Sequence, residues 1–102
     1  MKAEIYNFKV WLEITDPVEL EQLLEQWMAE AEFNILNKMS HHFQPYGYTA
    51  IWLLQESHLA VHTFPEEGKS YVELSSCNQA KNEKFINLIT TFKPIREKTI
   101  NE

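Results

Sequence analysis

Three short stretches of this sequence carry side chains that can do chemistry. In Glu56-Ser57-His58, a hydroxyl group stands between a carboxylate and an imidazole. His62 adds a second imidazole, and Cys77 is the only cysteine. Hydroxyl, imidazole and thiol groups can together support nucleophilic attack and proton transfer. Taken singly, each has a simpler explanation, as a turn serine, a polar strand residue or a small buried hydrophobic residue.

A serine hydrolase is one interpretation of Ser57 and His58. The sequence contains no Gly-x-Ser-x-Gly motif, which in many hydrolases presents the nucleophile on a sharp turn. Neighbouring residues of a strand point to opposite faces, so His58 would be badly placed as a base for Ser57. This pairing does not favour a hydrolase.

A metal site is not favoured either. His41 and His42 would point to opposite faces of a strand. His58 and His62 would share a face but lie roughly 13 Å apart at the usual strand rise, which is too far for one zinc ion. With a single cysteine and no third ligand at matched spacing, we expect no metal.

The overall composition narrows the classes of partner. The net charge is -6, so a nucleic-acid partner is not expected, because phosphate binding needs a basic face. The acidity suits a cationic substrate, but a surplus of this kind more often serves simple solubility, and the charge alone favours that explanation. The apolar run Ile51-Trp52-Leu53-Leu54 is far too short to cross a bilayer, and the first residues form no apolar signal core. A single cysteine is compatible with a reducing compartment, so we expect a cytoplasmic protein with no membrane association.

The hydrophobic pattern predicts the elements that must position these residues. Alternation predicts a half-buried strand over residues 4–14. Asp16 can cap a helix that has Pro17 in its first position and runs to about residue 33. The remaining elements are expected as strands over 38–44, 48–55, 58–64 and 70–76, a helix over 79–92, and a short edge strand around 95–99. The strand over 48–55 is apolar enough to be expected buried on both faces.

Short connections between successive strands predict antiparallel pairing. The expected fold is therefore one α+β domain over residues 1–102, a two-layer sandwich with a mostly antiparallel sheet and two helices packed on one face. The other face of the sheet would still need a cover. The number of apolar strand residues predicts that a second subunit supplies it.

The run from Phe43 to Cys77 resembles the short bacterial and archaeal class of S-adenosylmethionine decarboxylases. The resemblance covers about one third of the chain. It rests on the motifs Phe43-Gln44-Pro45-Tyr46-Gly47, Glu56-Ser57-His58-Leu59 and His62-Thr63-Phe64-Pro65-Glu66, on Cys77, and on the spacing between them.

This resemblance implies a proenzyme that cuts itself between Glu56 and Ser57. In the family, the serine hydroxyl attacks the preceding carbonyl, and the resulting ester undergoes β-elimination. Ser57 would then become a pyruvoyl group, which forms a Schiff base with the amine of an amino-acid substrate and acts as an electron sink. No bound cofactor and no metal would be needed. The implied reaction is decarboxylation of S-adenosylmethionine, which serves spermidine and other polyamine biosynthesis.

The resemblance also implies roles for individual residues. His62 would assist self-cleavage, and Thr49 would cooperate with it in the place of a family serine. Cys77 would donate a proton to the substrate after decarboxylation. The residues implied to bind substrate are Phe43 against the adenine, Glu66 at the ribose hydroxyls, and Glu56 at the adenine edge.

In the family, these groups come from two facing protomers. Ser57, Cys77 and Glu56 would come from one protomer of a homodimer, and Phe43, Thr49, His62 and Glu66 from the other. Some positions depart from the family pattern, among them Asn7-Phe8-Lys9, Phe64 and Asn78. Two alternatives therefore remain open: a pyruvoyl-dependent decarboxylase of another amino acid, such as ornithine or arginine, or a non-catalytic dimeric relative.

Overall fold

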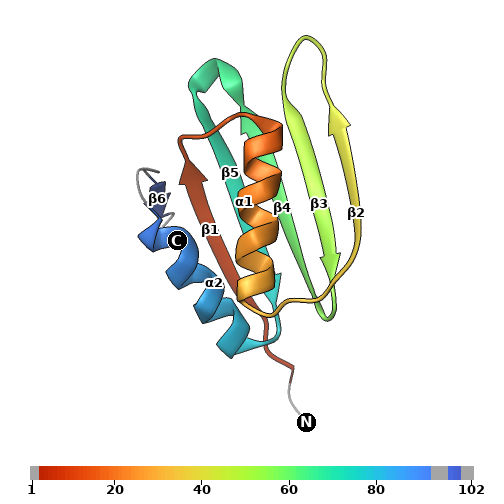
Figure 1. The fold of residues 1–102 in the computed structure, drawn as a ribbon, viewed down its shortest axis with the longest axis vertical. Coiled ribbons are helices and arrows are strands. Elements are labelled where there is room, and N and C mark those ends of the chain that lie inside the picture. The colour runs from red at the N-terminus through yellow and green to blue at the C-terminus, as the bar shows by residue number, and fades with distance from the viewer. Residues whose placement is uncertain (1–2, 93–96, 100–102) are drawn as a thin grey trace.

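The computed structural model describes residues 3–92 and 97–99. Within these residues, six strands and two α-helices follow one another, with a short 3-10 helix, η1, before the fifth strand (Figure 1). The elements are β1 (Tyr6–Leu12), α1 (Pro17–Glu30), β2 (Ile35–His42), β3 (Tyr48–Leu54), β4 (Ser57–Phe64), η1 (Pro65–Glu67), β5 (Lys69–Ser76), α2 (Gln79–Thr91) and β6 (Glu97–Thr99).

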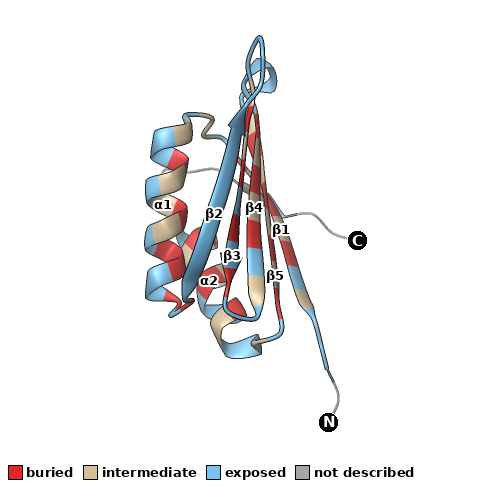
Figure 2. Cartoon of the chain, turned by 90° about the vertical axis from the view of Figure 1, so that its right-hand side faces the viewer, coloured by how far each residue is buried: buried red, intermediate tan, exposed pale blue. Residues whose placement is uncertain are grey.

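The strands form a single sheet in the order β2-β3-β4-β5-β1-β6, and every pair of neighbours is antiparallel. Both helices lie on the same face of this sheet (Figure 2). The expected α+β two-layer sandwich is therefore confirmed. The proposed edge strand is also present as β6, which pairs with β1, although residues 95 and 96 lie outside the described residues.

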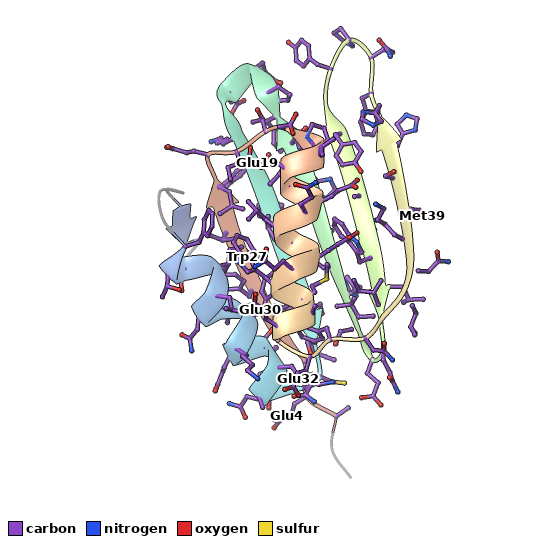
Figure 3. The ribbon with its side chains drawn as sticks, viewed as in Figure 1. Glu4, Glu19, Trp27, Glu30, Glu32 and Met39 are labelled. Carbon is purple, nitrogen blue, oxygen red and sulfur yellow. The ribbon has the colours of Figure 1, made fainter. Side chains whose placement is uncertain are left out.

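The helix-covered face of the sheet carries the core. Alternate residues of β1, β3, β4 and β5 point toward the helices and are buried, as the alternating pattern predicted. Trp52 and Phe85 are the largest of the fully buried side chains. Trp27 lies on the side of α1 that faces α2, with its ring 5.2 Å from that of Phe92 (Figure 3). This packing ties the two helices together over the sheet.

The first helix begins as predicted but ends earlier. The Asp16 carboxylate accepts a hydrogen bond from the backbone N–H of Glu19 at 2.9 Å, so it caps the helix. The helix stops at Glu30 rather than near residue 33, because Glu32 adopts a positive φ of 69°. Neither helix among the described residues combines the length and apolar character needed to cross a membrane.

The opposite face of the sheet has no cover within the described chain, and we call it the open face (Figure 2). It carries several large apolar side chains that are 40–71% exposed, among them Met39, Ile51 and Leu53. The expectation that residues 48–55 are buried on both faces is therefore wrong for the single chain. In β3, only the side chains toward the helices are buried, because the helices form just one layer.

Candidate active site

The Glu56–Ser57 peptide bond lies in the tight turn that joins β3 to β4. Leu54 and Ser57 are paired across this turn, so only Gln55 and Glu56 lie between the strands. The N–H of Gln55 donates to the carbonyl of Asn34 at 3.0 Å, which anchors the turn to the segment before β2. Glu56 has a φ of 65°, a left-handed conformation that is uncommon for a residue with a side chain.

Cys77 lies directly beside this peptide bond. Its Sγ donates to the carbonyl oxygen of Glu56 at 3.2 Å and lies 3.9 Å from the Oε1 atom of the same residue. Cys77 occupies the one position between the end of β5 and Asn78, whose side chain caps α2 by accepting from the N–H of Lys81. The side chain of Cys77 is exposed rather than buried, so it does not act as a core residue.

The Ser57 hydroxyl contacts a second serine that the sequence did not single out. Its Oγ donates to Ser76 Oγ at 2.8 Å, and Ser76 Oγ also accepts from the N–H of Asn78 at 3.0 Å. Ser76 is buried and pairs with Ser57 across β4 and β5. The two serines are 19 residues apart in the sequence, so their contact could be predicted only from the register between β4 and β5.

Glu56, Ser57 and Cys77 thus form one group at the lower end of the sheet in Figure 1, which we call the cleavage end. The expected residues Phe43, Thr49, His62 and Glu66 lie at the opposite end, around the β2–β3 turn and η1, which we call the far end. Ser57 and His62 are five residues apart on one strand, which corresponds to roughly 16 Å. They also point to opposite faces, Ser57 toward the helices and His62 to the open face.

Thr49 and His62 form a direct pair at the far end. They are opposite each other on β3 and β4, and Thr49 Oγ1 lies 2.9 Å from His62 Nδ1. The ring of Tyr71 stacks along the imidazole, with the ring centroids 6.3 Å apart and the planes at 26°. The imidazole is therefore held by a hydroxyl on one neighbouring strand and an aromatic ring on the other. The role of Tyr71 had no signal in the sequence, because it depends on the pairing of β4 with β5.

Phe43 and Glu66 are both accessible. Phe43 is 49% exposed, and its ring contacts that of His41 with centroids 4.5 Å apart. It lines a cavity of about 500 Å³ together with residues of the β2–β3 turn and the start of α1. Gly47 in that turn has a φ of 116°, which side chains rarely allow, and its carbonyl accepts from the Phe43 N–H at 2.8 Å. Glu66 is exposed in η1.

The site can therefore do nucleophilic and proton-transfer chemistry at two separate places. The cleavage end offers a hydroxyl and a thiol around one carbonyl, and the far end offers an imidazole and an accessible carboxylate. Among the described residues, no three histidine, cysteine or acidic side chains gather into a group that could hold a metal ion. The two groups lie at opposite ends of the sheet, so the single chain does not bring the thiol and the imidazole together.

Comparison with known proteins identifies the family. The model of the S-adenosylmethionine decarboxylase family matches residues 2–101. Proteins named S-adenosylmethionine decarboxylase proenzyme from Sulfurihydrogenibium sp. and Persephonella marina are 34% and 33% identical, in alignments covering 98% of this chain and 74% of theirs. A protein of the same name from Thermosipho africanus is 39% identical over 74% of this chain and 57% of its own.

A solved structure supports the same fold. The crystal structure of the adenosylmethionine decarboxylase from Aquifex aeolicus VF5 superposes with a TM-score of 0.68, covering 98% of this chain and 96% of that one. Its sequence is 24% identical, so this likeness speaks for the fold alone. The match of the family model over nearly the whole chain, together with these relatives, shows that the chain belongs to the S-adenosylmethionine decarboxylase family.

Proposed function

We propose that this chain is a self-cleaving, pyruvoyl-dependent decarboxylase of S-adenosylmethionine. The observation that carries the proposal is the geometry at the cleavage end. The thiol of Cys77 donates to the carbonyl oxygen of Glu56 at 3.2 Å, and Ser57 follows that carbonyl directly. A hydrogen bond to this oxygen polarises the carbonyl that the Ser57 hydroxyl must attack. Family membership supplies the expected chemistry, and Ser57, His62 and Cys77 are present for it, with Thr49 in the place of a family serine.

Self-cleavage uses groups of the protein and one water molecule. The Ser57 hydroxyl adds to the carbonyl carbon of Glu56, the C–N bond breaks, and the hydroxyl proton passes to the departing amine, which leaves an ester. Loss of the Ser57 α-proton then breaks the Cβ–Oγ bond, which frees the main-chain carboxylate of Glu56 and leaves a dehydroalanine. Water adds to the imine tautomer of this residue, and ammonia leaves. Ser76 accepts from the Ser57 hydroxyl in the uncut chain, so it orients the nucleophile. The partner's His62 takes the α-proton, because His62 of the same chain lies roughly 16 Å from Ser57. The hydrogen bond with Thr49 holds the imidazole in place.

The new terminal group is a pyruvoyl group, which supplies an electron sink for loss of carbon dioxide from the substrate. The rest of the reaction belongs to the side chains. Cys77 stays beside the new terminus and donates a proton to the substrate α-carbon. Phe43 offers an exposed ring for stacking on the adenine, and Glu66 offers an exposed carboxylate for the ribose hydroxyls. Glu56 would bind at the adenine edge, as the resemblance implies. The product would serve polyamine synthesis, including that of spermidine.

The working unit that we propose is a homodimer with shared sites. The open face exposes Met39, Ile51 and Leu53, and a second copy would bury them. The separation between Ser57 and His62 gives an independent reason, because each complete site needs the cleavage end of one protomer and the far end of its partner.

Intact mass under denaturing conditions tests the proposal. The purified protein should consist of fragments 1–56 and 57–102, the second with a carbonyl-reactive terminus, and should release carbon dioxide from carboxyl-labelled S-adenosylmethionine. The Ser57→Ala variant should remain one species near 12.1 kDa and be inactive. Ser75→Ala, a control on the neighbouring strand, should be cut normally. An uncut parent chain would contradict self-cleavage, and release from another amino acid alone would contradict the proposed substrate.

A further inference from the structure

Two residues other than glycine have a positive φ among the described residues, Glu32 at 69° and Glu56 at 65°. Such a left-handed backbone crowds the side-chain Cβ against a neighbouring carbonyl oxygen. The conformation persists only where the surrounding structure enforces it. The positive φ of each glutamate therefore needs an explanation in the surrounding structure or in the function of the protein.

Glu32 has an ordinary structural explanation. It follows α1, where the N–H groups of Ala31, Glu32 and Phe33 all return to carbonyls of the last helical turn. A left-handed residue at this place is a common way to end a helix, because it lets the chain turn while the last carbonyls stay hydrogen-bonded. The conformation of Glu32 therefore serves only the fold.

Glu56 is held by a different frame. It is the second residue of the two-residue turn between β3 and β4, whose register is set by continuous pairing from Thr49–His62 to Leu54–Ser57. The N–H of Gln55 is bonded outside the turn, and the Glu56 carbonyl accepts from the Cys77 thiol. The Gln55 contact holds the turn before Glu56, the Cys77 contact holds the Glu56 carbonyl, and the pairing with Leu54 holds Ser57. The strained residue is thus the one whose carbonyl reacts in the proposed cleavage.

We propose that the left-handed conformation makes Glu56 a positioning residue that speeds cleavage of its own peptide bond. This inference rests on the proposed function. When the Ser57 hydroxyl adds to the Glu56 carbonyl and the C–N bond breaks, the link between the strands runs through Oγ and Cβ and becomes one atom longer. The longer link lets the Glu56 backbone relax. The crowding therefore raises the free energy of the uncut chain more than that of the ester, which lowers the barrier between them.

A substitution series separates the backbone effect from the side chain. Glu56→Ala, Glu56→Asn and Glu56→Gly all remove the original carboxylate and its contact with Cys77, but their tolerance of positive φ increases in that order. We expect the cleavage rate, followed by intact mass after synthesis, to fall in the same order. The glycine variant should be slower than the alanine variant by about fivefold to tenfold.

The stability of the uncut protein should change in the opposite direction. Measured in a Ser57→Ala background, which stays uncut, the melting temperature should rise from alanine to asparagine to glycine at position 56. A merely structural role would move stability and cleavage together. If strain speeds cleavage, the alanine variant should be less stable than the glycine variant and yet be cleaved faster.

The same exchange at Glu32 is the matched control. This residue lies at the end of α1, outside the β3–β4 turn (Figure 3). Glu32→Gly should be more stable than Glu32→Ala, as at position 56, but both should be cut at the parent rate. If the glycine variant at position 56 is cut as fast as the alanine variant or faster, the inference is wrong while self-cleavage stands. If the parent chain is never cut, the proposed function itself fails.

Discussion

The cleavage end and the far end of the sheet hold their reactive groups in different ways. At the cleavage end, the thiol of Cys77 contacts the carbonyl of Glu56, and the hydroxyl of Ser57 contacts Ser76 on the adjacent strand. At the far end, the His62 imidazole is hydrogen-bonded to Thr49, and it points to the open face of the sheet. Under the proposed function, the cleavage end would act within its own chain, whereas the far end would act on a partner protomer.

The largest expected effect tests whether the far end acts on a partner. His62→Ala and Ser57→Ala should each remain uncut when expressed alone. When the two variants are expressed together, mixed dimers contain one complete site, because the Ser57→Ala chain supplies His62 to the His62→Ala chain. Intact mass should then show cleavage of the His62→Ala chain only.

The control for this experiment is a chain that carries both substitutions. Mixed with the His62→Ala chain, it should restore nothing, since it lacks the imidazole. Cleavage in the mixture with this control, or cleavage of the His62→Ala chain on its own, would contradict the proposal that His62 acts on the cleavage site of a partner. No recovery in the first mixture would also contradict it.

A smaller effect is expected at the Thr49–His62 contact. Thr49→Val keeps the shape of the side chain but removes the hydroxyl, so the imidazole loses one of its two supports. Cleavage should slow by about tenfold, the change that accompanies loss of one hydrogen bond worth about 1.4 kcal/mol. Thr49→Ser should be cut at nearly the parent rate in the same time course. Equal rates for the valine and serine variants would show that the contact has no part in cleavage.

The smallest effect is expected at Lys38, which lies between the two ends. Its Nζ is 2.9 Å from Glu21 Oε1 and 3.7 Å from Glu25 Oε2, and the hydrogen bond to Glu21 raises the pKa of Lys38 above its ordinary 10.5. Lys38→Met should lower the free energy of unfolding by about 0.5 kcal/mol at pH 7, the range of exposed ion pairs. The cleavage rate should stay at the parent value.

The sign of the pH dependence follows from the raised pKa. The folded chain holds the Lys38 proton more tightly than the unfolded chain, so this stabilisation is fully present below pH 10.5. It is lost as the pH rises through the higher folded value. Urea titrations of the parent and the methionine variant, both uncut through Ser57→Ala, should therefore converge above that pH. A gap that stays constant would assign the effect to packing instead.

Most of the fold could be predicted because its signals are local. Alternation marked the strands, and Asp16 marked the start of α1, where its carboxylate caps the helix as expected. The exposure of β3 could not be predicted, since Ile51 and Leu53 are apolar whether or not another layer covers them. The end of α1 was also missed, because the sequence gives no glycine at Glu32 to signal a left-handed residue.

The candidate site was predicted in its residues but not in its contacts. The motifs indicated Ser57, His62 and Cys77, and these remain predictions of function. The partners Ser76 and Tyr71 depend on the register between β4 and β5, which no short motif encodes. Contacts that depend on the pairing of strands far apart in the sequence are therefore the part of a site that short motifs do not predict.

The strand order has a consequence for what happens after the cut. Cleavage after Glu56 would place β1, α1, β2 and β3 in one fragment, and β4, β5, α2 and β6 in the other. In the sheet, β1 lies between β5 and β6, so the fragments interleave rather than sit side by side. The halves would hold together by strand pairing on both sides of β1. Unfolding would release two separate molecules, and refolding of the mature protein would then depend on concentration, whereas refolding of the uncut protomer would not.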